Sequence, residues 1–257
     1  NGAVAAGASL AISTIRQIDG LRVTGRTRAR QAEGVFLATG KHDLRGTARP
    51  RSASDPALGL RLRLEPSPGL AARLANTIEL HFFAGGYAGI VRQEDGSANL
   101  CLAVRKSLIG HAGANPTQLL AALAASHPHF ALRLETGWRE ARVDTIGSVP
   151  YGWSARVTEP GVFRLGDQAA VIPSLAGEGI DIALASGIAS AEAWLEGGPA
   201  AAPAYQQALH ERVRGPLRWA GAAWALAERP AIARLGLAAA RIAPNLVARL
   251  VDATRLD

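Results

Sequence analysis

A short apolar run that ends in Gly-Asp and leads through a glycine-bearing loop into a long helix most constrains this fold. The run covers residues 162–165, the pair is Gly166-Asp167, and the helix pattern covers residues 178–195. Such a run is typical of a strand buried in a parallel sheet. Open α/β sheets bind ligands at the carboxyl ends of these strands, where Asp167 would stand. An ordinary strand, loop and helix explains the pattern equally well.

The loop before this helix contains residues that leave its backbone accessible. Pro173 fixes a bend, and Gly177 and Gly179 leave backbone N–H groups unobstructed where the helix begins. A helix N-terminus stabilises negative charge that faces it. The loop therefore indicates a place where an anionic group could bind.

The remaining sequence predicts an antiparallel sheet with helices between two parts of an α/β domain. A second buried strand is expected in residues 34–40, and strict alternation predicts a half-buried strand in residues 58–65. An Asp-Gly turn signal at residues 94–97 predicts a hairpin. Further strands are expected at residues 21–25 and the residues that follow, and at residues 78–83, 87–92, 98–104 and 162–165. Helices are expected at residues 116–125 and 128–134, and from 201 onward with interruptions at Pro203, Pro216, Pro230 and Pro244.

The two strand ends resemble those of a known flavoprotein group. Gly166-Asp167-Gln-Ala-Ala, followed by Pro173 and Gly177-Glu-Gly-Ile180, resembles the second FAD-binding motif of the group that includes p-hydroxybenzoate hydroxylase and the geranylgeranyl reductases. The Gly-Glu-Gly-Ile portion is most similar to the reductase branch. Ala38-Thr39-Gly40 resembles the strand end that precedes the substrate domain in these proteins. The resemblance covers most of the chain.

The resemblance implies FAD as the cofactor and assigns roles at the strand ends. Asp167, directly after Gly166, would bind the ribityl hydroxyl groups, and Thr39 and Gly40 would lie near the dinucleotide. NAD(P)H is the electron donor that the resemblance implies.

The same resemblance assigns roles in the loop. Pro173 would lie along the flavin ring, and the backbone around Ala176, Gly177 and Gly179, next to Ile180, would face the N1 and C2-carbonyl edge. A reduced flavin is anionic at that edge, which suits the positive end of a helix dipole.

Two departures from the family pattern affect what can be expected. The chain contains no Gly-x-Gly-x-x-Gly, the motif that holds the pyrophosphate. Together with the start at Asn1 and the lack of methionine, this leads us to expect that an N-terminal FAD-binding segment lies elsewhere. Of the pattern Pro-x-Tyr-x-Trp-x-Phe-Pro that geranylgeranyl reductases carry, this chain retains only the tyrosine, Tyr87, which puts a prenyl substrate in doubt.

Three aromatic residues are candidates for a substrate pocket. Tyr87 lies on a predicted strand, and Tyr151 and Trp153 stand just before the chain returns to the predicted FAD-binding domain. The alternatives are a cross-strand aromatic for Tyr87 and core packing for Tyr151 and Trp153. No side chain stands out as a general acid or base, so the catalytic residues are unassigned, as suits chemistry centred on a flavin.

The predicted function is an FAD-dependent oxidoreductase that acts on an apolar organic small molecule. The first alternative is an FAD-dependent monooxygenase, a hydroxylase that uses NAD(P)H and oxygen. A hydrophobic-ligand binding module or an inactive fragment without cofactor is the alternative from another class. The sequence identifies neither the substrate nor the oligomeric state.

Charge and composition exclude several other classes. The net charge is +7, but the arginines are scattered and only 5% of residues are aromatic, so nucleic-acid binding is not expected. His127 and His129 lack further ligands, so no metal site is expected. Cys101 is expected to be a buried small hydrophobe. We expect a cytoplasmic protein, with peripheral membrane contact through arginine-containing C-terminal helices as an option.

The expected fold class is α/β, a partial FAD-binding Rossmann-like domain interrupted by an antiparallel-sheet substrate domain. The first part of the FAD-binding domain would be residues 1–45, the substrate domain 46–145, the second FAD-binding part 146–197 and the C-terminal helices 198–257.

Overall fold

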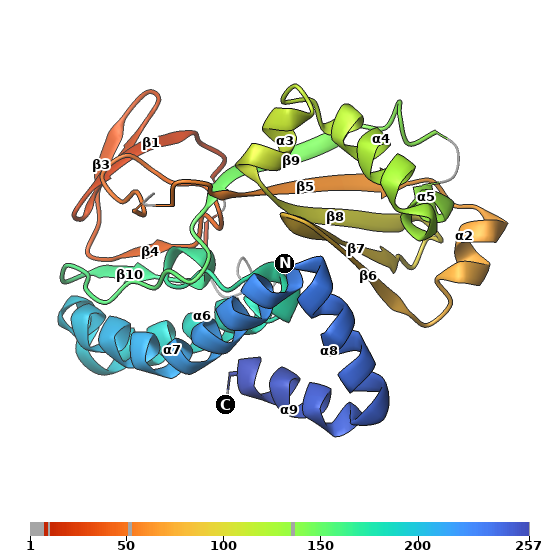
Figure 1. Cartoon of the computed structure of the whole chain (residues 1–257). Helices are drawn as coiled ribbons and strands as arrows, with labels where there is room; N and C mark the ends of the chain where they lie inside the picture. The colour runs from red at the N-terminus through yellow and green to blue at the C-terminus, as the bar shows by residue number, and fades with distance from the viewer. Residues whose placement is uncertain (1–7, 10, 51–52, 135–136, 257) are drawn as a thin grey trace. The chain divides into compact units, whose positions relative to one another are not determined.

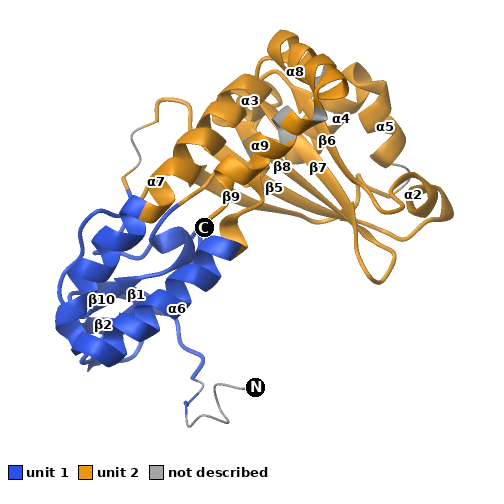
Figure 2. Ribbon diagram, turned by 90° about the horizontal axis from the view of Figure 1, so that it is seen from below, with its two compact units in different colours: residues 1–49, 155–170, 181–211 blue, residues 50–154, 171–180, 212–257 orange. Residues whose placement is uncertain are grey.

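The computed structural model describes residues 8–9, 11–50, 53–134 and 137–256, and the chain divides into two compact units. Unit 1 takes residues 1–49, 155–170 and 181–211, and unit 2 takes residues 50–154, 171–180 and 212–257 (Figure 2). Each unit contains both strands and helical residues, so the fold is mixed α/β.

Unit 1 contains the parallel strand pair that the two apolar runs predict. Strand β4 (Val35–Leu37) pairs in parallel with β10 (Val162–Arg164). A second, antiparallel sheet consists of β1 (Ile15–Asp19), β2 (Arg22–Gly25) and β3 (Ala29–Gln31). The strand expected from residue 21 onward is confirmed by β2, whereas β1 had no strand prediction. The carboxyl ends of β4 and β10 therefore lie side by side.

Aromatic rings pack on the parallel pair. Phe36 and Phe163 stack with ring centroids 4.8 Å apart, and Trp194 from α6 (Gly179–Gly197) meets both rings edge-on. A Cβ at position 34 would overlap the Trp194 ring, so Gly34 allows the helix to approach the strand. The helix predicted at residues 178–195 is confirmed by α6.

Unit 2 contains a five-stranded antiparallel sheet with the order β6-β7-β8-β5-β9. The strands are β5 (Ala57–Leu64), β6 (Ile78–Phe83), β7 (Gly86–Arg92), β8 (Ala98–Arg105) and β9 (Val143–Val149). The predicted hairpin is confirmed, since Gln93 N–H donates to the Ser97 carbonyl oxygen at 2.7 Å and Gly96 has a φ of +84°. The alternation in residues 58–65 is confirmed by β5, whereas β9 had no strand prediction.

Four helices cover one face of this sheet (Figure 1). They are α2 (Pro68–Arg73), α3 (Lys106–His111), α4 (Pro116–Ser126) and α5 (Pro128–Leu134). Leu100 and Leu102 of β8 point into the core beneath them, so the strand alternation turns Cys101 to the other face, where it is exposed. The prediction of a buried Cys101 is therefore wrong.

The C-terminal part is helical, as expected, but the prolines act differently from one another. Pro230 and Pro244 begin α8 (Pro230–Ile242) and α9 (Pro244–Thr254), as suits a residue without an N–H. Pro216 lies inside α7 (Ala202–Ala227), and the helix continues past it although proline lacks the N–H for one helical hydrogen bond. Val213 and Leu217 beside it are buried, so their packing can compensate for the lost bond. Within the part of the chain that the structure describes, none of the helices has both the length and the apolar character that crossing a bilayer requires.

Candidate functional site

The carboxyl ends of β4 and β10 bring together the predicted residues of unit 1. Leu165 N–H donates to the Leu37 carbonyl oxygen at 2.9 Å, which extends the strand pairing by one step. Thr39 and Gly40 follow the end of β4, and Gly166 and Asp167 begin the 3₁₀ turn that follows β10. An ideal Cβ on Gly40 would lie 3.9 Å from Asp167 Oδ2. This is the end of a parallel sheet at which α/β proteins bind ligands.

Gly166 and Gly40 both adopt backbone conformations that favour glycine. Their φ angles are +51° and +60°, in the left-handed region. Gly166 N–H donates to Ser186 Oγ at 2.9 Å, and a Cβ at Gly166 would lie 3.3 Å from the Ala183 methyl group. The Gly-Asp turn is therefore fixed against α6 by close packing and one side-chain acceptor.

A buried arginine that the sequence analysis did not identify connects the two strand ends. Arg49 donates from Nη1 to the Asp167 carbonyl oxygen at 2.8 Å and from Nη2 to the Lys41 carbonyl oxygen at 2.6 Å. Its Nε donates to Asp43 Oδ1 at 2.6 Å, and its side chain is 1% exposed. Burial of this charge is tolerable because each contact is a charge-assisted hydrogen bond.

Gln168 adds a second connection between the same segments. Its Nε2 donates to the carbonyl oxygens of Gly40 and His42, both at 2.9 Å, and the residue is 1% exposed. Thr39 Oγ1 donates to the His42 carbonyl oxygen at 2.8 Å. The loop after β4 is therefore held to the turn after β10 by buried polar groups.

The Asp167 carboxylate itself remains partly accessible. Its Oδ2 lies 3.3 Å from Lys41 Nζ, and the two side chains are 23% and 35% exposed. This ion pair contributes little stability at such exposure. An accessible carboxylate beside an ammonium group can accept hydrogen bonds from a ligand's hydroxyl groups.

The loop residues predicted to face the flavin lie in unit 2. Pro173 precedes the 3₁₀ turn Ser174–Ala176, and Gly177 follows it with a φ of +79°. A Cβ at Gly177 or Gly179 would meet no described atom within 4 Å, and Ile180 is 73% exposed. The backbone at the start of α6 is therefore open to a ligand.

Two candidate pocket residues, Tyr87 and Tyr151, converge on one hydroxyl group. Tyr87 Oη donates to Ser174 Oγ at 2.9 Å, and Tyr151 Oη lies 2.8 Å from the same atom. Both rings pack against Trp224 of α7, with centroids 5.4 and 5.5 Å away. Burial raises the pKa of the Tyr87 phenol above its usual value of 10, so the phenol stays protonated at neutral pH.

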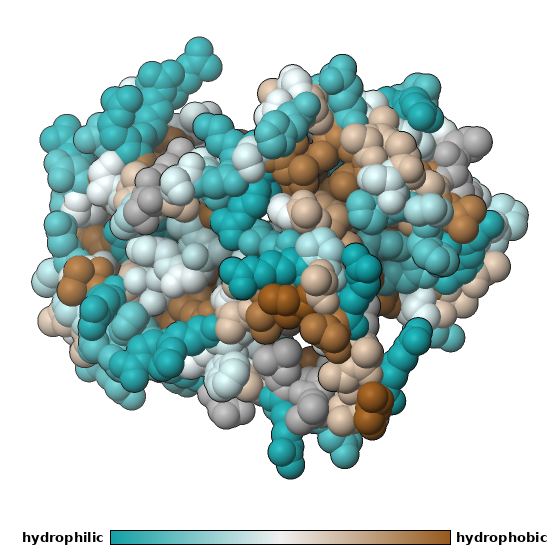
Figure 3. All heavy atoms as spheres, in the orientation of Figure 1, coloured by the Kyte–Doolittle hydropathy of each residue, from teal (hydrophilic) through white to brown (hydrophobic). Residues whose placement is uncertain are grey.

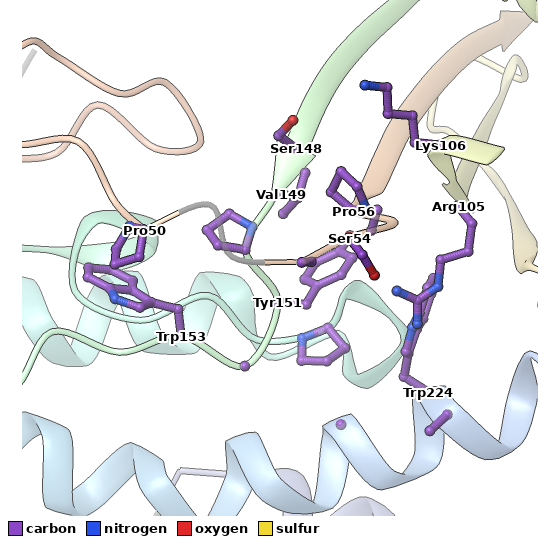
Figure 4. Close-up of a pocket in the computed structure, with 17 residues that line it drawn as sticks. Pro50, Ser54, Pro56, Arg105, Lys106, Ser148, Val149, Tyr151, Trp153 and Trp224 are labelled. Carbon is purple, nitrogen blue, oxygen red and sulfur yellow. The ribbon is translucent and has the colours of Figure 1, made fainter. Parts of the chain in front are cut away.

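A pocket of about 660 Å³ in unit 2 includes Tyr151, Trp153 and Pro173 in its wall. Figure 4 shows Trp153 on one side, Tyr151 in the middle, and Arg105 with Trp224 on the other side. Trp224 was not predicted, because its helical context gives no sign of a pocket. The Tyr87 side chain is buried behind this wall and is not part of it.

Arg105 fixes the helix that supplies Trp224. Its Nε and Nη2 each donate to one carboxylate oxygen of Glu228 at 2.7 Å, and its Nη1 donates to the Asp55 carbonyl oxygen at 3.0 Å. The guanidinium carbon lies 5.9 Å from the Trp224 ring centroid. A bidentate pair of this kind is geometrically specific.

Of the two histidines considered as metal ligands, His127 contacts the end of α4. His127 Nδ1 lies 3.1 Å from the Leu123 carbonyl oxygen and 3.0 Å from Ser126 Oγ. Among the described residues, no group of three or more His, Cys, Asp or Glu side chains could hold a metal ion.

Solved structures with a similar fold are the matches that comparison with known proteins finds. No protein-family model and no curated protein sequence matches the chain. The peptidyl tryptophan dihydroxylase QhpG is 19% identical with a TM-score of 0.65, over 88% of this chain and 53% of QhpG. HpxO of Klebsiella pneumoniae, solved with FAD and uric acid, is 14% identical with a TM-score of 0.67, over 94% and 66%.

A third structure is PqsL from Pseudomonas aeruginosa, described as a probable FAD-dependent monooxygenase. It is 18% identical with a TM-score of 0.56, over 86% of this chain and 65% of PqsL. The chain thus spans between about half and two thirds of the length of these three proteins. At such identity the likeness shows the fold, a mixed α/β fold shared with proteins that use FAD.

Proposed function

We propose that this chain contributes the FAD-binding and substrate-binding residues of an FAD-dependent monooxygenase. The observation that carries the proposal is the accessible Asp167 carboxylate at the joined ends of β4 and β10. The motif resemblance assigns this residue to FAD. QhpG is named as a dihydroxylase and PqsL as a probable monooxygenase, which favours hydroxylation.

The residues present fit the cofactor. The ribityl chain has hydroxyl groups that can donate hydrogen bonds to the Asp167 carboxylate, while Thr39 and Gly40 would lie near the dinucleotide. The two glycines at the strand ends, Gly40 and Gly166, leave the backbone there without side chains. When bound, FAD supplies the redox chemistry, using electrons from NAD(P)H.

The loop of unit 2 would serve the flavin ring. Pro173 would lie along it, and the backbone at Ala176, Gly177 and Gly179, beside Ile180, would face its anionic edge. Support comes from the open space around both glycines and from the helix that begins at Gly179. Backbone N–H groups at a helix start favour negative charge there.

Substrate would bind on the aromatic side of unit 2. Tyr151 and Trp153 would contact an organic, mainly apolar small molecule, and Tyr87 would position Tyr151 through Ser174 Oγ. The neighbours support a small-molecule substrate, since HpxO was solved with uric acid. The aromatic walls would also exclude water from the reaction.

We also propose the domain division 1–45, 46–145, 146–197 and 198–257, with the FAD-binding parts first and third. The parallel pair in unit 1 and strands β5 to β8 in unit 2 support it, whereas β9 extends across the boundary at residue 145. The expected cytoplasmic location stays a prediction.

A reductase that transfers hydride to a double bond is the second candidate. The segment Gly177-Glu-Gly-Ile180 favours it, because this segment is most similar to the geranylgeranyl reductase branch. The two reactions differ in oxygen use, since a monooxygenase consumes one oxygen molecule for each NAD(P)H.

The test is the visible spectrum of the full-length reading frame that contains this chain, purified and incubated with FAD. We expect flavin absorbance near one FAD per protein after removal of unbound FAD. Oxygen and NAD(P)H consumption with candidate substrates would then separate the two reactions. A colourless protein that retains lipid would contradict the proposal and favour a binding module.

A further inference from the structure

Helix α8 has one partnered side and one apolar side that faces solvent. Its inner side packs beside β6 and α9, where Ile232, Ala233 and Ala240 are half-buried. On the other side, Leu235 is 71% exposed and Ile242 is 87% exposed. Because residues seven apart lie on the same helix face, these two side chains form one stripe.

The rest of the exposed α8 side extends this stripe. It includes Ala231, Ala238 and Ala239, all exposed, so the side is apolar over the length of the helix. Isolated surface leucines are common, but a continuous apolar side indicates a binding surface. This side is called the α8 apolar face below.

Two arginines border the α8 apolar face, and a third is exposed on α9. Arg234 and Arg241 lie along one edge of it, and Arg249 is exposed on α9. Among the described residues, no carboxylate forms an ion pair with any of the three. These charges are therefore available to an anionic partner.

The charge imbalance covers the whole C-terminal region of unit 2. Residues 212–257 contain eight arginines but only three acidic side chains, those of Glu228, Asp252 and Asp257, a net side-chain charge of +5. Glu228 is bound by Arg105, and Asp252 lies 3.4 Å from Arg255. In Figure 3, hydrophobic and hydrophilic residues adjoin one another in the region where Figure 1 places α8 and α9.

We infer that α8 and α9 dock on a lipid surface with anionic headgroups, with the α8 apolar face toward the acyl chains and Arg234, Arg241 and Arg249 toward the headgroups. An apolar helix side bordered by arginines is the pattern of an interfacial helix. Arginine stems can lie along apolar surface while the guanidinium groups reach phosphate. An acidic protein would use the arginines but would leave the apolar face without a matching partner.

This inference goes beyond the proposed function and does not depend on it. It requires neither FAD nor turnover, because the surface lies on α8 and α9 alone. Its test can therefore fail while the flavin assignment stands, and the reverse also holds.

The experiment is co-sedimentation of the chain with vesicles of phosphatidylcholine alone or of phosphatidylcholine mixed with the anionic lipid phosphatidylglycerol. We expect binding to the anionic vesicles, weaker binding to the neutral ones, and loss of binding at high salt. The variant R234Q/R241Q/R249Q should bind anionic vesicles at least about tenfold more weakly. L235S/I242S should lower binding to both kinds of vesicle.

Matched controls come from unit 1. R26Q/R28Q/R30Q removes the same number of charges from exposed positions, and I12S/V157S removes two exposed apolar side chains. Both should bind as the unmodified chain does. The inference is overturned if the charge control weakens binding as much as the test variant, or if the unmodified chain ignores anionic vesicles. Self-association that L235S/I242S abolishes, without lipid binding, would show a second copy as the occupant instead.

Discussion

Unit 1 and unit 2 differ in the interactions that stabilise each of them internally. Unit 2 encloses a large core, in which side chains such as Leu62, Ile90, Leu100 and Phe130 are almost fully buried. Unit 1 has a small apolar core around Ile18, Leu37 and Val162, and it joins its strand ends through buried polar groups. It also exposes an apolar stripe on α6, with Leu184, Ile188 and Leu195 at least 61% exposed.

The difference suits the role proposed for the strand ends of unit 1. Apolar burial gives a rigid sheet without specifying where individual polar groups lie. Hydrogen bonds are directional, so Arg49 and Gln168 can fix the position of Asp167 and of the loop after β4. The site proposed for the ribityl chain, at Asp167, therefore lies where unit 1 uses polar contacts.

The largest expected effect is in the unit 2 core. Phe130 is 1% exposed, so Phe130→Ala removes a whole ring and leaves a cavity. We expect a loss of about 4 kcal/mol in the free energy of unfolding, measured by urea titration. Leu132→Ala on the same helix is the control, since Leu132 is 54% exposed and should cost less than about 0.5 kcal/mol. Equal effects would contradict the burial account.

Arg49 is the corresponding test in unit 1. Arg49→Gln leaves the Asp43 carboxylate without its buried guanidinium and removes donors to the carbonyl oxygens of Asp167 and Lys41. We expect a loss of about 3 kcal/mol in urea unfolding. Arg49→Lys keeps the charge and should recover only part of the loss, because a lysine cannot reproduce the forked geometry. If Arg49→Lys recovered the whole free energy of unfolding, the positive charge alone, and not the forked hydrogen bonding, would account for the stability.

A smaller effect is expected for the partly buried ion pair between Arg133 and Glu79 in unit 2. Arg133 donates twice to Glu79 at 2.7 Å and, as the main cause, lowers the pKa of Glu79 below its usual 4.5. The stabilisation is therefore present above pH 4.5 and is lost as the pH falls through the lower folded-state pKa. Glu79→Gln should cost about 1 kcal/mol at pH 7, and this cost should shrink at acid pH.

The pH experiment needs one further variant. His81 lies 3.2 Å from Glu79, and burial lowers the pKa of His81 below its usual 6.5. Protonation of His81 would add a favourable charge beside Glu79 in acid. Repeating the titration in an H81N background separates the two groups. A cost of Glu79→Gln that stays constant with pH in that background would show that the ionised carboxylate is not responsible.

Local patterns predicted much of unit 2 but little of what fixes unit 1. The strict alternation in residues 58–65 and the turn at Gly96 identified strands β5, β7 and β8, because each pattern is complete within a few residues. Strand β9 was missed, since Asp144, Gly147 and Ser148 interrupt its alternation. Its pairing with β5 depends on partners distant in sequence.

The candidate site likewise contains residues that local patterns identified and residues that only the structure revealed. Asp167 and Gly40 were found because each follows a short apolar run directly. Arg49 contacts Asp167 across 118 positions of sequence, and no local pattern marks such a residue. Trp224 likewise looks like any residue of an amphipathic helix until its contacts with Tyr87 and Tyr151 are seen.

The most direct test of the central claim is the FAD dissociation constant of the full-length protein with Asp167→Ala, from flavin fluorescence quenching. Losing a charged hydrogen-bond acceptor costs about 1.5–3 kcal/mol, so FAD should bind roughly 10- to 100-fold more weakly. The control is Asp144→Ala, an exposed carboxylate of β9, which should leave the constant within about twofold. Unchanged FAD binding in a folded Asp167→Ala protein would contradict the assignment of the strand ends to the cofactor.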